Sequence, residues 1–243
     1  MAAETASFIN WGLLALSPPG WGGVLLWGFL NSLQIAIGGY CLGLILGVGG
    51  ASGKLYGGPV TRDLLACYTT VVRAVPELVL IVLLYYAGTD AINALLRLAG
   101  LGTVDISGLT AGILVIGIVQ GAYSTEVLRG AIKAVPVGQI EAARAYGMSP
   151  WKVMRRVTLP AMLPHAIPGL SNLWLIATKD TALLAVVGFS ELTLVTRQAA
   201  GTTKAYILFF CAAGVLYLAL TLVSNVIIKI IERRSRRGFA EVI

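Results

Sequence analysis

Residues 5–53 read TASFINWGLLALSPPGWGGVLLWGFLNSLQIAIGGYCLGLILGVGGASG, and no charged side chain interrupts them between Glu4 and Lys54. About 20 consecutive apolar residues in a helix are enough to cross the hydrocarbon core of a bilayer. The rest of the 243-residue chain has the same character, since 57% of all residues are hydrophobic, only 12% are charged and the mean hydropathy is +0.85. Charged residues make up about 25% of an ordinary soluble domain. The sequence therefore predicts an all-α integral membrane protein.

Four further apolar tracts follow, each long enough to cross a bilayer. We expect spans within a single transmembrane domain, residues 1–243, at about residues 21–50, 64–88, 106–129, 164–188 and 205–231. The two prolines of the sequence SPPG end any helix before the first span. In that span Gly39, Gly43 and Gly47 recur every four residues, a pattern that lets a neighbouring helix approach closely.

Lysine and arginine are distributed unevenly between the two ends of these spans. Thirteen of the 18 lie on the side that holds the C-terminus, three lie on the other side, and Arg73 and Lys179 lie inside spans. Because loops rich in lysine and arginine stay in the cytoplasm, we expect the N-terminus outside and the C-terminus in the cytoplasm. The formal net charge of +7 then reflects this topology and not nucleic-acid binding.

Signatures of catalysis are missing from the sequence. The stretch GVGGASGKL is similar to a phosphate-binding loop, but it has Val48 where that loop needs its first glycine and Leu55 where it needs a hydroxyl residue. The chain has one histidine, and its three cysteines, Cys41, Cys67 and Cys211, show no metal-ligand spacing. We therefore expect no catalytic residue, no metal and no cofactor in this chain, and active transport would need a partner that hydrolyses ATP.

The stretch EAARAYGMSPWKVMRRVTLPAMLP occupies residues 141–164, outside the expected spans. A short helix at residues 137–146 would present one apolar face, formed by Ile140, Ala143 and Tyr146. Gly147 would end this helix, because glycine adopts the left-handed backbone conformation of a helix end at little cost. On physical grounds alone, such a helix is either an interfacial support or a docking element.

This stretch closely resembles the EAA loop of the permease subunits of ATP-binding-cassette (ABC) importers. That loop has the pattern Glu-Ala-Ala, three residues, Gly, nine residues, an apolar residue and then Leu-Pro. The matching positions are Glu141, Ala142, Ala143, Gly147, Val157, Leu159 and Pro160. Three further stretches resemble the polar amino acid branch of the family, most of all its permeases for histidine, arginine and opines: YTTVVRAVPELVLIVLLYY (68–86), GAYSTEVLRGAIKAVPVGQ (121–139) and KDTALLAVVGFSEL (179–192).

The resemblance implies the transmembrane domain of a type I ABC importer, with five spans and a cytoplasmic coupling helix in a loop at about residues 133–163. Glu141, Ala142, Ala143 and Gly147 would couple the spans to the ATPase. The implied partners are a second permease chain, identical or paralogous, two ATP-binding subunits that hold ATP and Mg²⁺, a periplasmic or lipid-anchored substrate-binding protein, and the membrane lipid.

The function implied by the resemblance is ATP-driven import of a polar amino acid, in particular a basic one, or of an opine. One alternative is an ABC importer permease for another small polar solute. A secondary transporter or a channel is a further alternative, although neither needs a cytoplasmic docking helix. Co-purification with an ATPase would distinguish the importer from both.

Four ionisable residues lie within the expected spans, where charge is costly and faces a cavity or another charge. Arg73 and Glu77 are four residues apart, which would place them on one face of a single helix, and Lys179 and Asp180 are neighbours in the fourth span. Separated positive and negative groups would suit a zwitterionic amino acid, so we predict that these four residues line the substrate pathway. The alternative is that Arg73 pairs with Glu77, and Lys179 with another acidic group, only to survive burial.

Overall fold

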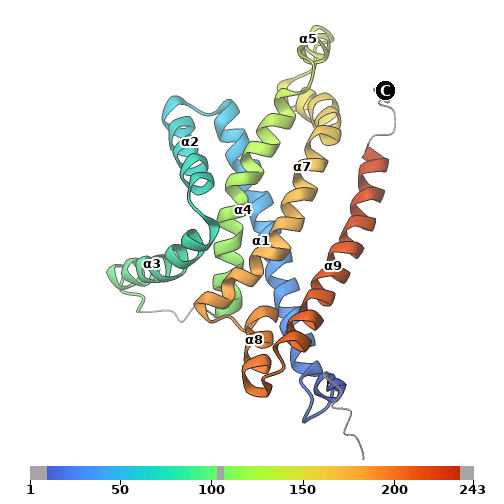
Figure 1. Ribbon diagram of the computed structural model, residues 1–243. Coiled ribbons are helices and arrows are strands. Elements are labelled where there is room, and N and C mark those ends of the chain that lie inside the picture. Colours follow the sequence, from blue (N-terminus) through green and yellow to red (C-terminus); the bar gives the residue numbers. More distant parts are fainter. Residues whose placement is uncertain (1–9, 103–106, 236–243) are drawn as a thin grey trace, which may run out of the picture.

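The computed structural model describes residues 10–102 and 107–235, and every regular element in these ranges is a helix (Figure 1). Five helical segments are long and apolar enough to cross a membrane: Gly22–Tyr56, Glu77–Leu98, Gly108–Lys133, Pro150–Val187 and Tyr206–Ser235. The expected all-α fold with five spans is therefore confirmed. Several of the segments begin or end at other residues than the sequence predicts.

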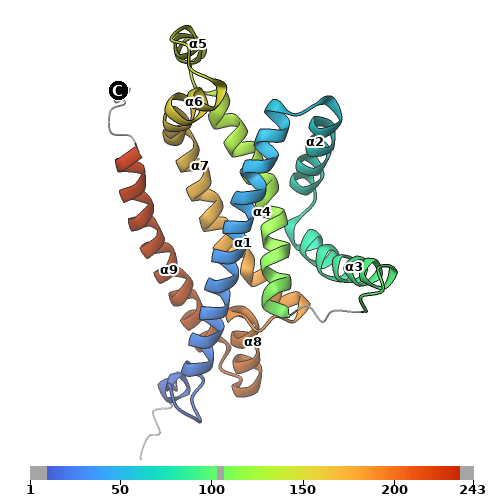
Figure 2. The same ribbon diagram turned by 180° about the vertical axis from the view of Figure 1, so that it is seen from behind.

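The centre of the molecule is formed by α1 (Gly22–Tyr56) and α4 (Gly108–Lys133), which lie side by side (Figures 1 and 2). The glycines of α1 make this possible. A Cβ atom on Gly43 would lie 2.7 Å from the Cβ atom of Gln120, which is closer than real side-chain atoms approach. The same holds at Gly39 and Gly47, so α4 occupies the space that larger residues on α1 would fill.

The range 64–88, expected as one span, is not one helix. The chain forms α2 (Pro59–Ala74), an extended break at Val75 and Pro76, and then α3 (Glu77–Leu98). Pro76 lacks the N–H group that a continuing helix needs, and proline also disfavours helical geometry in the residue before it. As a consequence, α3 leaves the bundle at an angle to α1 and α4 (Figures 1 and 2).

The fourth span also differs from its expected range, 164–188. It consists of four consecutive elements: α6 (Pro150–Val153), the π-helical turn η2 (Met154–Thr158), α7 (Leu159–Asp180) and the 3-10 helix η3 (Thr181–Val187). Pro164 and Pro168 lie inside α7 and do not end it. Membrane-spanning helices tolerate proline, because neighbouring helices and local π-helical adjustments satisfy the carbonyl groups that proline leaves free.

The remaining elements lie at the two ends of the bundle. A short 3-10 helix, η1 (Trp11–Leu14), precedes α1, while α5 (Val137–Ala145) follows α4 and projects from the opposite end (Figure 1). α8 (Leu192–Thr203) follows η3, and α9 (Tyr206–Ser235) runs back along the bundle (Figure 1). The expected start of the third span, Ile106, lies outside the described residues.

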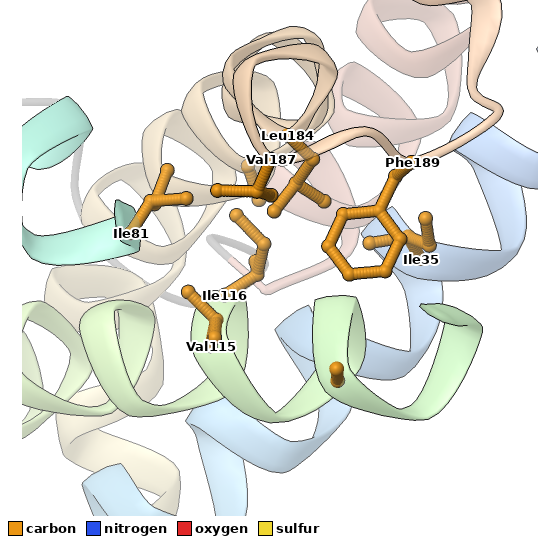
Figure 3. Packing of buried hydrophobic residues seen from close by; sticks show 9 residues of the cluster. Ile35, Ile81, Val115, Ile116, Leu184, Val187 and Phe189 are labelled. Carbon is orange, nitrogen blue, oxygen red and sulfur yellow. The ribbon is translucent and has the colours of Figure 1, made fainter. Parts of the chain in front are cut away.

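The largest cluster of buried apolar side chains in the described part of the chain lies between the middle of the bundle and the end away from α5. Side chains from α1, α3, α4, η3 and the turn after η3 meet there: Ile35, Ile81, Val115, Ile116, Leu184, Val187 and Phe189 (Figure 3). Ile81 belongs to the start of α3 and is 1% exposed, whereas most of the rest of α3 is exposed. The core therefore holds the beginning of α3 in place, directly after the break at Pro76.

A buried carboxylate, Glu191, ties α8 to α1 and α9. It is fully buried at the N-cap of α8, where it accepts hydrogen bonds from the backbone N–H groups of Thr193 (2.8 Å) and Leu194 (2.7 Å). The hydroxyl groups of Ser32 on α1 and Tyr217 on α9 also donate to it, each at 3.3 Å. Four donors from three helices thus satisfy a group that the sequence analysis did not single out.

Candidate functional site

The residues predicted to line the substrate pathway gather where α2, α3, α4 and α7 approach one another. The junction of α2 and α3 lies beside α4 about midway along the bundle (Figure 1). The break at Pro76 places the two residues in different helices: Arg73 is in the last turn of α2 and Glu77 is in the first turn of α3. The expectation that these two residues share one face of a single helix is therefore wrong.

Arg73 is exposed and faces an aromatic ring. Its guanidinium carbon lies 6.0 Å from the centroid of the Tyr123 ring on α4, at the outer limit of a cation–π contact. Within the described ranges Arg73 forms no ion pair, so the predicted alternative in which it pairs with Glu77 is not observed there. The positive charge of Arg73 is consequently exposed at the surface of the region where α2, α3, α4 and α7 approach one another.

Glu77 lies beside a second carboxyl group, and it forms no ion pair with a cation within the described residues. Its side chain interacts with the carboxyl group of Asp180, at the end of α7, and with the hydroxyl group of Tyr123. Asp180 is only 7% exposed. Two carboxyl groups side by side form a centre of negative charge, which a proton or a cation must neutralise. The arrangement can therefore receive a positively charged group.

Gln120 supports Asp180 from the interior of the bundle. It is fully buried on α4, and its amide nitrogen donates a hydrogen bond to Oδ2 of Asp180 at 3.3 Å. Its amide oxygen has no hydrogen-bond partner in the described part of the chain. Lys179 is exposed and interacts electrostatically with Asp180, but it makes no ion pair within the described residues. Sequence reasoning missed Gln120, although an amide amid the apolar residues of α4 could have marked it.

A separate ionic network joins α1, α2 and α4 nearer to α5. The ammonium group of Lys54 lies 2.6 Å from Oε1 of Glu126 and donates to the hydroxyl oxygen of Thr69 at 2.8 Å. Arg129 binds the other carboxylate oxygen of Glu126, also at 2.6 Å. The sequence analysis did not predict this network, because no local pattern connects Lys54 with a residue as distant in sequence as Glu126.

The second predicted region, α5 and its C-terminal turn, has the expected helix end. Gly147 has a φ of +73°, in the left-handed region that favours glycine. The N–H group of Gly147 donates to the carbonyl of Arg144 at 2.9 Å, and that of Met148 donates to the carbonyl of Ala143 at 3.1 Å. These two bonds are those of a Schellman motif, which closes the last turn of a helix.

The surface of α5 is more exposed than its expected apolar face suggests. Ala143 is 5% exposed, while Glu141, Ala142 and Gly147 are open to solvent. Tyr146 is 87% exposed because the helix ends one residue earlier, at Ala145, so Tyr146 does not pack with Ala143. The segment also exposes Val137 and Trp151. Large exposed apolar side chains at a projecting end are typical of a protein–protein contact.

Comparisons with known proteins agree over nearly the whole chain. Residues 39–237 match the family described as binding-protein-dependent transport system inner membrane component. The histidine/lysine/arginine/ornithine transport system permease protein HisQ of Escherichia coli is 40% identical over 219 residues, which cover 90% of this chain and 96% of HisQ. The octopine transport system permease protein OccQ of Rhizobium radiobacter is 37% identical over 227 residues, which cover 93% of this chain and 96% of OccQ.

Solved structures show the same fold. A chain of an amino acid ABC transporter, crystallised with histidines, superposes with a TM-score of 0.74 at 27% identity and covers 88% of this chain and 95% of that chain. An inward-facing methionine ABC transporter superposes with a TM-score of 0.67 at 18% identity, with 88% of this chain and 99% of that chain covered. The fold similarity thus extends beyond the range in which the sequences are closely related.

Proposed function

The chain belongs to the family of binding-protein-dependent transport system inner membrane components, and from that membership we propose that it is the permease subunit of an ABC importer for basic amino acids or opines. Such a subunit provides half of a pathway across the inner membrane and catalyses no reaction itself. ATP and Mg²⁺ are bound by two partner ATPase subunits, and a periplasmic or lipid-anchored protein delivers the substrate to a pair of permease chains, identical or paralogous.

The observation that carries the substrate class is the pair of carboxyl groups at Glu77 and Asp180. An ammonium or guanidinium group placed beside them would neutralise the pair through charge-assisted hydrogen bonds. Arg73 is a cation without an ion pair in the described part of the chain and lies across the ring of Tyr123, so it can receive the carboxylate of the same molecule. A basic amino acid or an opine offers both kinds of group.

The proposed direction of transport follows from the ends of the bundle. With α5 in the cytoplasm, the N-terminus lies outside and the C-terminus inside, as the lysine and arginine distribution predicts. Glu141, Ala142, Ala143 and Gly147 then face the ATPase and couple its closure to movement of the spans. The side chains of Tyr146 and Trp151 support this contact, because they are large, mostly apolar and exposed.

Reconstitution tests the proposal. The chain is purified alone and together with its ATPase, its binding protein and any second permease chain, and both preparations are placed in proteoliposomes with ATP inside or outside. We expect no ATP hydrolysis by the chain alone and ATP-driven uptake of labelled arginine by the complex, with much weaker uptake of glutamine. Uptake that runs without ATP would identify a secondary transporter or a channel. Preference for a neutral solute would assign the permease to another substrate.

A further inference from the structure

A pocket of about 330 Å³ lies at the end of the bundle where α5 projects. The turn between α1 and α2 and the last turns of α4 form this end (Figures 1 and 2). The pocket is lined by Lys54 and Leu55 of α1, Arg62 of α2, and Arg129 and Lys133 of α4. Four of the five lining residues are therefore cations, and they come from three helices.

The positive charge of this pocket is largely uncompensated. Lys54 and Arg129 share the single carboxylate of Glu126. Arg62 and Lys133 are exposed, and neither takes part in an ion pair within residues 10–102 and 107–235. The nearest acidic residue in sequence, Asp63, is exposed and does not line the pocket. Clefts lined by charges of one sign attract a counter-ion, so this pocket favours an anion.

We propose that the pocket binds the phosphate group of an anionic phospholipid headgroup in the cytoplasmic leaflet. The inference rests on the orientation proposed above, which places the ends of α1 and α4 at the inner surface of the membrane. That surface is rich in anionic lipids, and basic pockets between membrane-spanning helices bind their headgroups. Arg62 and Arg129 supply planar groups that can bind two phosphate oxygens at once, and Lys133 adds a further charge.

The position of the pocket favours a lipid over the ATPase as the occupant. α5 and its C-terminal turn project beyond the ends of α1, α2 and α4 (Figures 1 and 2), so a protein that docks on α5 meets it first. The pocket lies further back, beside the last turns of α1 and α4, which the proposed orientation places at the headgroups of the inner leaflet. A bound phosphate would contact α1, α2 and α4 together and would hold α2, with Arg73 at its other end, against the bundle.

Native mass spectrometry of the full-length chain can test this. The chain is purified in a mild detergent and titrated with phosphatidylglycerol, with phosphatidylcholine as the zwitterionic comparison and inorganic phosphate as the soluble competitor. The test variant is Arg62→Gln with Lys133→Gln. The matched control is Lys229→Gln with Arg233→Gln, which removes two exposed cations from the last turns of α9. Because all four side chains are exposed, both variants should fold, and retention of the monodisperse chain on gel filtration checks this.

We expect one phosphatidylglycerol to bind in preference to phosphatidylcholine, and the test variant to bind it about thirtyfold more weakly, since each cation near a lipid surface contributes about 1 kcal/mol. The control should bind as the unaltered chain does. Equal losses in both variants, or no preference for the anionic lipid, would overturn the proposal. If millimolar inorganic phosphate displaces the lipid, the pocket binds free phosphate, and the proposal of a lipid headgroup is overturned. In a parallel co-purification with the partner ATPase, loss of the ATPase from the test variant with unchanged lipid binding would overturn the proposal in favour of a protein contact. Transport is not measured, so failure here leaves the proposed function untouched.

Discussion

At the scale of single residues, two buried carboxyl groups have opposite surroundings. Glu191 accepts four hydrogen bonds from backbone N–H and hydroxyl donors, so its charge is satisfied by the protein itself. Asp180 accepts a hydrogen bond from Gln120 and faces another acidic group, Glu77. A buried carboxylate costs free energy unless it is paired or hydrogen-bonded. This contrast supports a structural role for Glu191 and the proposal that Asp180 faces the substrate.

We predict that Glu77→Gln weakens transport of arginine far more than that of a neutral amino acid, because it removes one charge and nearly preserves shape. A charge-assisted hydrogen bond contributes about 1.5–3 kcal/mol, so the apparent affinity for arginine should fall about tenfold to a hundredfold. Uptake in proteoliposomes at matched protein abundance measures this. Asp90→Asn, an exposed acidic residue further along α3, is the control and should leave selectivity unchanged. An equal loss for both substrates would remove Glu77 from the binding site.

Glu191→Ala should destabilise the folded chain. It removes an N-cap, a change that costs about 1 kcal/mol, and leaves the buried hydroxyl group of Ser32 without its acceptor, at about 1–3 kcal/mol for a buried group. Tyr217 loses one partner and keeps the hydroxyl group of Thr193, 3.3 Å away. Thermal unfolding of the purified chain in detergent should therefore begin at a clearly lower temperature. Gln198→Ala, at an exposed position of α8, should change the midpoint little. If the two variants unfold at the same temperature, the assigned role of Glu191 is contradicted.

At the scale of helices, close packing of α1 on α4 depends on the absence of side chains at particular positions. A Cβ atom on Gly43 would lie 2.7 Å from the side chain of Gln120 and 3.2 Å from the backbone nitrogen of Gly121, whereas nothing lies within 4 Å of such an atom on Gly49. Backbone atoms cannot turn away as a flexible side chain can. The two glycines of one helix thus have different tolerance for the same substitution.

We predict that Gly43→Ala destabilises the bundle by about 1–3 kcal/mol, the usual range for an overpacked core. The matched variant Gly49→Ala should be neutral or slightly stabilising, because alanine is about 0.5–1 kcal/mol more favourable than glycine within a helix. The measurement is the unfolding midpoint of each variant in detergent. If Gly43→Ala is as stable as Gly49→Ala, the α1–α4 contact is looser than these distances indicate.

A second pair of glycines tests the coupling helix α5. Gly147→Ala forces an L-residue into the left-handed region at a cost of about 1–2 kcal/mol, and so should shift the end of α5. We expect reduced substrate-stimulated ATP hydrolysis by the assembled transporter at normal membrane abundance. Gly138→Ala, within α5 and with free space around it, should hydrolyse ATP normally. If both variants keep full ATPase activity, Gly147 has no role in coupling.

At the scale of the whole molecule, the two ends of the bundle are built differently. One end carries α5 and the last turns of α1, α4 and α9, whereas the other carries η1 and α8 (Figure 1). The basic pocket, lined by residues of α1, α2 and α4, lies at the first end. Cations are concentrated at the first end, and loops rich in lysine and arginine stay in the cytoplasm. This asymmetry makes the orientation in the membrane a testable property.

The orientation predicts which ends a membrane-impermeant thiol reagent reaches. In a chain with Cys41, Cys67 and Cys211 replaced by alanine, Thr202→Cys at the end of α8 should be labelled in spheroplasts. Tyr146→Cys should be labelled only after the membrane is permeabilised, since it lies beside α5. Both positions are exposed, so access and not burial decides the result. The reverse pattern would invert the proposed topology.

The sequence by itself determined those features that depend on a local pattern of residues. Apolar tracts of sufficient length predicted five spans, the four-residue glycine spacing predicted a close helix contact, and Gly147 predicted the end of α5, because each depends on neighbouring residues. The break between α2 and α3 is also a local effect, of Pro76, although the sequence analysis placed one span across it. Only the tertiary structure decided that Glu77 meets Asp180 and not Arg73. It also decided that Lys54 binds Glu126 and that Glu191 is enclosed by three helices. The residues of these contacts are distant in sequence. Their contacts depend on how the helices pack against one another, and the periodicity along a single helix carries no information about that packing.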